Sequence, residues 1–281
     1  MTSSTNAQQI EYWNGPAGER WARLQEKIDL HLEQITEAAL CFAAPQEGER
    51  ILDIGCGCGT TTFLLAFRVG DTGVAAGLDI SQPMLGVARA RSLAQNADLP
   101  FIEGDASNYD FQPVFDLVFS RFGIMFFADP VSAFANIRKA LAPAGRLAFV
   151  CWRSMAENIW ASAPMEAATR LLPSQEPVDP LAPGPFAFAD CERLRSILAS
   201  AQYSHVEIER FDGTMNMGAT LEEAAAEVLN IGPLSRAATD LDEDMRAKIR
   251  RAVEVAFAPY ASPAGVKPPA ACWLVRARPY A

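Results

Sequence analysis

Basic residues and histidine are scarce in this sequence. Its 281 residues contain 24 Lys and Arg against 34 Asp and Glu, together with two histidines, so the formal net charge at pH 7 is −10. A protein that binds nucleic acid concentrates positive charge to meet the phosphates, and no cluster of Lys or Arg offsets the deficit locally here. The composition therefore argues against a nucleic acid and predicts a small or weakly charged partner.

Long apolar runs and a cysteine framework are also missing. No stretch approaches the roughly 18 apolar residues that a membrane span needs. The first residues do not show the basic start and following apolar run of a signal peptide. Six cysteines are dispersed along the chain, apart from Cys56 and Cys58, which is typical of reduced thiols in a cytosolic protein. We therefore expect a cytoplasmic protein with no membrane partner.

Apolar periodicity predicts an alternation of strands and helices in the first half of the chain. Short apolar runs indicate buried strands at 50–55, 73–80, 100–105, 113–122 and 146–152. Helical spacing is expected over 18–43, 61–69, 82–97 and 130–145, the last ending at Pro143 and Gly145. Strands joined by helix-length crossovers form a parallel, doubly wound α/β sheet.

The pattern changes after residue 152. A helical piece and a Pro-rich loop, "PSQEPVDPLAPGPFAF", occupy 153–189, and Asp190 is typical of an N-cap for a helix over 191–201. A strand at 204–211, two helices within 220–258 and a last strand at 271–278 follow. We interpret 1–47 as an N-terminal helical lid segment, 48–152 as a cofactor-binding core, 153–189 as an inserted lid, and 190–281 as the completion of the sheet with a helical insertion at 213–262.

The stretch "ILDIGCGCGTTT" places a glycine-rich turn between a strand and a helix. Such a turn presents backbone N–H groups and a positive helix end to an anionic or polar ligand, and glycine allows that ligand a close approach. Asp79 ends the second strand about 20 residues further on, where a carboxylate accepts hydrogen bonds from both hydroxyls of a ribose. Asp105, in "EGDA", ends the third strand, where it can meet an adenine amino group.

The glycine spacing distinguishes two kinds of nucleotide-binding enzyme. Nicotinamide dehydrogenases usually have G-x-G-x-x-G, whereas Gly55, Gly57 and Gly59 form G-x-G-x-G, with Asp53 two residues before the first. Together with "GLDIS", "EGDA", "FDLVFSRFGIMFF" and "LAPAGRLAFV", this set resembles the class I S-adenosylmethionine-dependent methyltransferases. Within them it is similar to the small-molecule branch related to the ubiquinone and menaquinone biosynthesis methyltransferases. The resemblance covers residues 48–152 well and extends loosely to the final strand.

The resemblance implies a fold and a set of cofactor contacts. The fold is a seven-stranded, mostly parallel, Rossmann-like sheet whose last strand is antiparallel, and the cofactor is S-adenosyl-L-methionine. Asp79 would hold the ribose, while Ser120 and Arg121 would lie beside the reacting methyl group. The implied cofactor contacts are Trp13, Trp21, Asp53, Gly55, Cys56, Gly57, Gly59, Asp79, Ile80, Met84, Gly104, Asp105, Ala106 and Ser120.

Cys56 and Cys58 raise the question of a thiolate site. A structural zinc site usually has four ligands, often in two cysteine pairs, and the other four cysteines are scattered. One intervening residue also differs from the redox C-x-x-C spacing. Since both cysteines lie in the glycine turn, we interpret them as small turn residues, and we expect neither a metal site nor an arsenic-methylating thiolate set.

Few side chains qualify as a general base for methyl transfer. His31 lies on the apolar stripe of the helix over 18–43, from which it can reach an acceptor, whereas His205 alternates away from Val206 and is expected to be solvated. We name His31 and Arg121 as catalytic candidates, and the apolar residues after 152 favour a small apolar or aromatic acceptor. Three alternatives stay open: use of the sulfonium without methyl transfer, for instance in cyclisation, a non-catalytic cofactor-binding protein, and a nicotinamide dehydrogenase.

Overall fold

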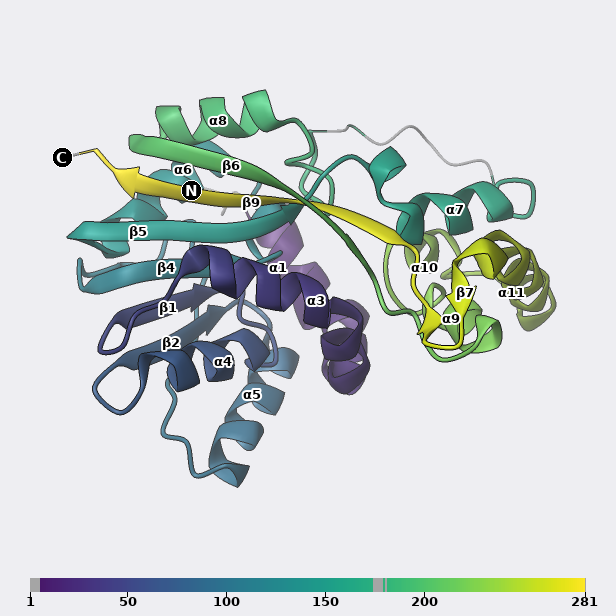
Figure 1. The fold of residues 1–281 in the computed structure, drawn as a ribbon, viewed down its shortest axis with the longest axis horizontal. Coiled ribbons are helices and arrows are strands. Elements are labelled where there is room, and N and C mark those ends of the chain that lie inside the picture. Colours follow the sequence, from purple (N-terminus) through teal and green to yellow (C-terminus); the bar gives the residue numbers. More distant parts are fainter. Residues whose placement is uncertain (1–5, 174–178, 180, 281) are drawn as a thin grey trace.

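A seven-stranded sheet forms the centre of the molecule (Figure 1). The computed structural model describes residues 6–173, 179 and 181–280. The strand order is β3-β2-β1-β4-β5-β9-β6. Its strands are β1 (Arg50–Ile54), β2 (Val74–Asp79), β3 (Phe101–Glu103), β4 (Phe115–Arg121), β5 (Leu141–Trp152), β6 (Tyr203–Thr214) and β9 (Pro269–Pro279).

Six strands run in one direction, and β9 runs against them. β9 pairs antiparallel with both β5 and β6. The neighbouring pairs β3–β2, β2–β1, β1–β4 and β4–β5 are all parallel. The predicted doubly wound sheet with an antiparallel last strand is therefore confirmed. Because parallel strands end at one edge, the loops after β1, β2, β3 and β4 meet there, at the switch in strand order where such sheets bind ligands.

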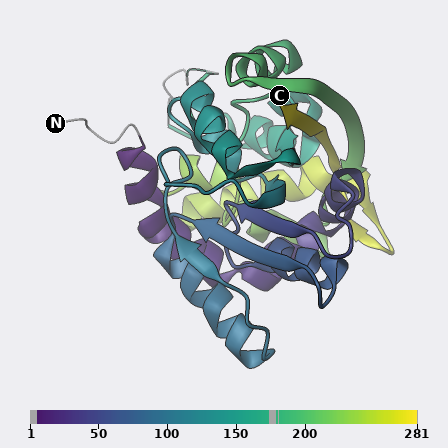
Figure 2. The same ribbon diagram turned by 90° about the vertical axis from the view of Figure 1, so that its left-hand side faces the viewer.

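Helices cover both faces of this sheet (Figures 1 and 2). On one face lie α3 (Gln25–Ala43), α4 (Thr60–Val69) and α5 (Gln82–Ala94), and on the other α6 (Pro130–Ile137) packs against α8 (Cys191–Ser200). The side chain of Asp190 accepts from two backbone N–H groups of α8, so the predicted N-cap is confirmed. Two short helices, α1 (Ala7–Asn14) and α2 (Pro16–Arg23), precede α3. None of the described helices is both long and apolar enough to cross a membrane.

A separate group of elements faces the carboxyl ends of the strands (Figure 1), and we name it the lid cluster. It comprises α7 (Ile159–Ala168), α9 (Leu221–Glu227), α10 (Pro233–Ala237), α11 (Glu243–Phe257) and the small hairpin of β7 (Ala261–Ser262) and β8 (Gly265–Val266). α11 packs on both α7 and α9, so segments from before and after β6 form one body. The Pro-rich loop falls partly on residues 174–178 and 180, which lie outside the described part.

Two boundary predictions are wrong. The helix expected over 130–145 ends as α6 at Ile137 with a short 3-10 turn, η2 (Arg138–Ala140), and β5 begins at Leu141. The pairing of β5 with β4 shifts in register between Phe115 and Leu117 and so forms a bulge. A bulge tolerates a proline such as Pro143 within a strand. A Cβ at Gly145 would lie 2.8 Å from Phe115 O, so glycine fits this position. The single helix expected over 18–43 breaks at Leu24, which separates α2 from α3.

The later segment contains more elements than the sequence predicts. Three helices, not two, occupy the region around 220–258. β6 and β9 extend beyond the expected strands at both ends. His205 is exposed, as predicted, and has a left-handed φ of +49° at a register shift in β6. Three further 3-10 turns complete the described elements: η1 (Ile124–Phe126), η3 (Met155–Glu157) and η4 (Ala258–Tyr260).

Candidate active site

The glycine turn connects β1 to α4 at the carboxyl edge of the sheet. Gly55, Gly57 and Gly59 have φ values of +67°, +53° and +85°, a region that L side chains rarely adopt. A Cβ at Gly55 would also lie 2.5 Å from the Cα of Gly123, in the loop after β4. Two loops thus approach backbone to backbone, which only glycine allows, and the turn opens onto a cavity of about 560 Å³.

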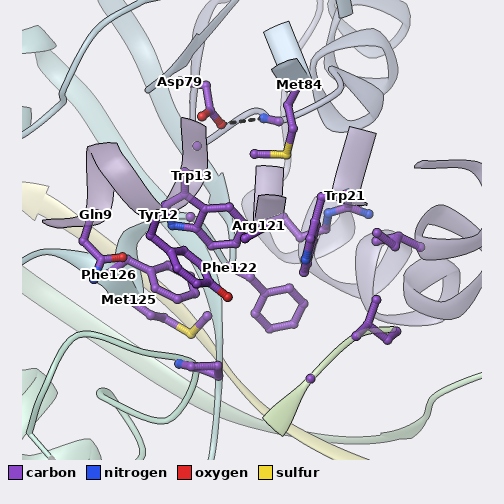
Figure 3. A pocket seen from close by; sticks show the side chains of 18 of the residues that line it. Gln9, Tyr12, Trp13, Trp21, Asp79, Met84, Arg121, Phe122, Met125 and Phe126 are labelled. Atoms are coloured by element: carbon purple, nitrogen blue, oxygen red, sulfur yellow. Dashed lines mark hydrogen bonds between the residues drawn. The ribbon is translucent and has the colours of Figure 1, made fainter. Parts of the chain in front are cut away.

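Asp79 lies at the end of β2 and faces the glycine turn (Figure 3). Its side chain is buried, with 7% exposed. One carboxylate oxygen accepts from the backbone N–H of Gly57 at 2.7 Å, and the other accepts from that of Ser81 at 2.8 Å. Burial raises the pKa of Asp79, and these backbone hydrogen bonds oppose the rise. The carboxylate is therefore held rigidly at the cavity wall, and its remaining lone pairs can accept from a ligand.

The end of β3 contributes a second polar region of the wall. Asp105 accepts from Asn6 Nδ2 at 3.2 Å and from the backbone N–H of Ser107 at 2.9 Å. Two further oxygens, Asn6 Oδ1 and Gln9 Oε1, are buried and have no hydrogen-bond partner among the described residues. Since a buried acceptor without a donor costs free energy, these two oxygens indicate where a ligand with N–H or O–H groups fits.

The α1–α2 segment roofs this part of the cavity. Trp13 packs edge-on against Trp21 and Phe126, with ring centroids 5.6 and 5.2 Å apart (Figure 3). The segment is fastened to the loop after β2, because Ser81 Oγ donates to Trp13 O at 2.7 Å and Asn14 Nδ2 donates to Ile80 O at 2.8 Å. The roof therefore depends on close contact between the end of α1 and the loop that leads from β2 to α5.

We expect Gly18→Ala to weaken cofactor binding by about tenfold or more, because the roof would have to shift. A Cβ there would lie 1.9 Å from Trp13 O and 2.8 Å from Ser81 Oγ. Gly86→Ala on α5 is the matched control, since its Cβ meets nothing within 4 Å, and the removal of a helical glycine there stabilises the protein. Isothermal titration with S-adenosylhomocysteine measures both variants. An unchanged affinity in Gly18→Ala would contradict the role of the roof.

A charged network that the sequence reasoning missed lies at the end of β4. Arg121 donates to Thr36 Oγ1 at 2.8 Å and approaches Asp29 Oδ1 at 3.4 Å. The other oxygen of Asp29 accepts from Thr60 Oγ1 at 2.5 Å, at the start of α4, and from Gln25. Asp29, Gln25, Thr60 and Arg121 all line the cavity. Asp29 gives no local motif because its partners Thr60 and Arg121 are distant in sequence.

The cavity continues from this network into an apolar chamber under the lid cluster. Phe122 has a left-handed φ of +64°, which is uncommon for a bulky residue and costs free energy. This conformation stacks its ring on that of Trp152, with centroids 4.2 Å apart and planes 11° apart, and Trp152 packs against Trp160 at 4.9 Å. The chamber wall is completed by Met125, Phe127, Met155, Met165, Pro185, Phe186, Met215 and Ile231.

Most of the predicted site residues line the cavity. The structure brings together Trp13, Trp21, Gly55, Cys56, Gly57, Asp79, Ile80, Met84, Gly104, Asp105, Ala106 and Arg121. Three predicted cofactor contacts do not line it. Asp53 is fully buried and accepts from Thr61 Oγ1 and Thr62 Oγ1 at 2.6 and 2.7 Å. Gly59 faces Phe101, and Ser120 Oγ donates to Ile54 O at 2.7 Å. These three residues hold the turn and the strand ends from behind.

His31 also does not line the cavity. It lies one turn after Lys27 on α3, and Lys27 forms an ion pair at 2.5 Å with Glu227 on α9. Burial lowers the pKa of His31, and the nearby Glu227 opposes that shift. The imidazole is thus buried near Glu227 of α9 and outside the cavity that Ile28 and Leu32 of the same helix line, so it does not join the other predicted site residues there.

The cysteines of the glycine turn are neutral thiols. Cys56 and Cys58 are both free, and burial is the main cause that raises their pKa values, that of Cys58 to about 12. Within the described ranges, no group of three or more His, Cys, Asp or Glu side chains is placed to hold a metal ion. The geometry supports the interpretation of these cysteines as turn residues.

We therefore expect Cys58→Ala to keep the affinity for S-adenosylhomocysteine within about threefold, because a neutral thiol at this position contributes only packing. Cys56→Ala tests the same expectation at a more tightly packed position, because the Sγ of Cys56 fills the space against Gly77. Calorimetric titration of both variants tests this expectation. A thiolate site would instead give two results together: Cys58→Ala would lose binding, and added Zn²⁺ would strengthen binding by the wild type.

Comparison with known proteins finds a family model that matches part of the chain. Residues 51–145 match a family model described as a methyltransferase domain. The chain is 35% identical over 111 residues to aklanonic acid methyltransferase DauC from Streptomyces sp. (strain C5), a match that covers 38% of this chain and 50% of that protein. It is 36% identical over 129 residues to demethylmenaquinone methyltransferase from Thermus thermophilus, covering 46% and 52% respectively. The chain thus spans about half the length of these curated relatives.

A solved structure extends the likeness of fold to the whole chain. Phosphoethanolamine N-methyltransferase 2 of Haemonchus contortus, in complex with S-adenosyl-L-methionine, superposes with a TM-score of 0.60 at 19% identity, over 99% of this chain and 61% of that chain. At this identity the likeness concerns the fold alone. Residues 51–145 are thus similar to a methyltransferase domain, and the superposition shows that the chain has the Rossmann-like fold of that solved structure.

Proposed function

We propose that this chain is an S-adenosylmethionine-dependent methyltransferase that acts on a small, largely apolar acceptor. One observation supports this most strongly: a single cavity joins the polar cradle of Gly57, Asp79 and Asp105 to the aromatic chamber of Phe122, Trp152 and Trp160. A cofactor and an acceptor can therefore lie side by side. The relatives named above act, by their names, on aklanonic acid and demethylmenaquinone, which agrees with a small-molecule acceptor.

The residues of the cradle fit this cofactor. We assign the carboxylate of Asp79 to the two ribose hydroxyls, whose hydrogen bonds it would accept. Among the described residues no donor reaches the buried oxygens Asn6 Oδ1 and Gln9 Oε1, and the adenine amino group would supply one near Asp105. Ile80 and Met84 would flank the adenine ring. We assign the methionine end to the glycine turn and the amino end of α4, whose backbone N–H groups favour a carboxylate, with Asp29 and Arg121 beside it.

The proposed chemistry depends chiefly on positioning. When bound, the cofactor supplies an electrophilic methyl group on a sulfonium, and the positive charge disperses as a nucleophile attacks in line. The chamber walls exclude water and hold the acceptor at attack distance, which provides most of the rate in such reactions. Neither histidine lines the cavity, and Arg121 is held by Thr36 and Asp29. We therefore propose an orienting role for Arg121 and no imidazole base.

Other features of the proposal rest on composition. The net charge of −10 favours a small molecule over a nucleic acid. A cytoplasmic location rests on the dispersed, free cysteines.

Product analysis tests the proposed reaction. The protein is incubated with S-adenosylmethionine and a panel of hydroxylated naphthalenes and naphthoquinols, and the nucleoside products are separated by chromatography. Acceptor-dependent formation of S-adenosylhomocysteine supports methyl transfer. Methylthioadenosine as the main product would instead support use of the sulfonium without methyl transfer. Tight binding of the cofactor with no turnover on any acceptor would support a non-catalytic binding protein.

A further inference from the structure

Two arginines stand on the side of the cavity away from the strand ends. Arg20 comes from α2 and Arg236 from α10, so one belongs to the roof and the other to the lid cluster, and both line the cavity. The acidic residues of the lining, Asp29, Asp79 and Asp105, come instead from α3 and from the ends of β2 and β3. The wall is thus divided between a carboxylate side and a guanidinium side.

Both guanidinium groups contact neutral partners, and neither is neutralised by them. Arg236 Nε donates to Tyr12 Oη at 2.9 Å, and its guanidinium lies 4.5 Å from the centroid of the Tyr12 ring. Arg20 Nη1 donates to the backbone oxygen of Asn230 at 3.5 Å. Both contacts use neutral partners and leave other N–H donors of each guanidinium available. A planar donor group that is fixed in this way is suited to bind a carboxylate.

No acidic side chain pairs with either of them in the described part of the chain. Arg121, the third arginine of the lining, is paired with Asp29. The carboxylates of Asp79 and Asp105 are bound by backbone and amide donors at the strand ends. Arg20 and Arg236 therefore bring to the cavity two positive charges that no acidic side chain of the described residues pairs with, in a chain whose net charge is −10.

We propose that the acceptor carries an anionic group, such as a carboxylate, which Arg20 and Arg236 bind while its apolar body occupies the chamber of Phe122, Trp152 and Trp160. This rests on the proposed function, because it names the class of molecule that the methyltransferase site selects. The same two arginines also join the roof to the lid cluster through Tyr12 and Asn230. An anion bound between them would strengthen that junction over the acceptor.

The test compares an acid with its ester. 6-Hydroxy-2-naphthoate and its methyl ester share an aromatic body and differ in the charge. Their affinities for the protein saturated with S-adenosylhomocysteine are measured by quenching of tryptophan fluorescence, and the cofactor analogue itself is titrated by calorimetry in the same samples. We expect the acid to bind about tenfold or more tightly than the ester, as charge-assisted hydrogen bonds at a partly exposed site provide.

Variants separate recognition of the anion from a structural role. In the double variant Arg20→Gln, Arg236→Gln, we expect the ratio of the affinity for the acid to that for the ester to fall to near one. In Arg236→Lys, which keeps the positive charge, we expect this ratio to be partly kept. Loss of a merely structural junction would weaken acid and ester alike and leave the ratio unchanged. Arg246→Gln is the matched control, because Arg246 of α11 lies outside the cavity lining and donates to Ala238 O, after α10, at 2.8 Å.

The outcomes are distinct. Equal affinities for acid and ester in the wild type, failure of the acid to bind, or an unchanged ratio in the double variant overturns the anionic acceptor and leaves the methyltransferase proposal standing. Failure of S-adenosylhomocysteine itself to bind overturns the proposed function instead.

Discussion

Replacement of Asp79 by alanine is expected to weaken the binding of S-adenosylhomocysteine by about 100-fold or more, close to complete loss at practical concentrations. The variant would lose the acceptor for both ribose hydroxyls, and hydrogen bonds to a charged group contribute about 1.5–3 kcal/mol each. It would also leave the N–H groups of Gly57 and Ser81, which donate at 2.7 and 2.8 Å, without their partner. Isothermal titration calorimetry measures the loss directly.

The matched control for this experiment is Asp190→Ala. Asp190 also accepts from two backbone N–H groups, of Glu192 and Arg193, but it caps α8 and does not line the cavity. We expect it to lower stability by about 1 kcal/mol, as the loss of an N-cap does, with no change in the affinity for the cofactor analogue. Retention of wild-type affinity in Asp79→Ala would contradict the assignment of the ribose site.

The second large expected effect is a pH dependence of the unfolding free energy that comes from Asp53. Burial is the main cause that raises the pKa of Asp53 to about 6, from an ordinary value of 3.8, against the opposing hydrogen bonds from Thr61 and Thr62. The folded protein therefore binds a proton more readily at this group than the unfolded chain does. Stability from this group is thus present at low pH and is lost as the pH rises through about 6.

We expect the difference in unfolding free energy between wild type and Asp53→Asn to change with pH. Acidification from about pH 8 to about pH 5 should favour the wild type by about 1.4 kcal/mol relative to the variant, because asparagine does not titrate. Urea unfolding of the cofactor-free protein at a series of pH values measures this. A difference that is independent of pH, or that moves in the opposite direction, would contradict the burial of an ionisable carboxyl group.

Thr62→Val offers a second check of the same mechanism. Its hydroxyl donates to Asp53 Oδ2 at 2.7 Å and stabilises the charged form. Without that hydroxyl the pKa of Asp53 should rise further, and the pH range in which stability changes should move upward.

The sequence predicts those site residues that belong to short motifs at the ends of successive strands. Gly55 and Gly57 follow a buried strand within a few residues, and Asp79 ends the next strand. Backbone conformation and strand direction then place them at one edge. Asp53 was expected in the wall because it belongs to the same motif, yet its side chain points toward Thr61 and Thr62 behind the turn.

The part that the sequence does not predict depends on contacts between distant segments. Asp29 meets Thr60 and Arg121, which lie 31 and 92 residues further on. Arg20 and Arg236 reach one cavity only because α2 and the lid cluster face each other. His31 shows the converse: it lies on the apolar stripe of α3, yet Ile28 and Leu32 of that stripe line the cavity whereas the imidazole is buried near Glu227 of α9. Periodicity alone does not say which neighbour each residue of a stripe meets.

The most direct test of the central claim is thermal unfolding of the wild-type protein with S-adenosylmethionine, S-adenosylhomocysteine and NAD in parallel. A ligand at about 100 times its dissociation constant adds about 2.7 kcal/mol, which is a shift of about 5 °C or more for a protein of this size. We predict such a shift with both adenosyl compounds and none with NAD. A shift with NAD alone would make the protein a dinucleotide-binding enzyme, and no shift with any of the three would contradict a cofactor site in this cavity.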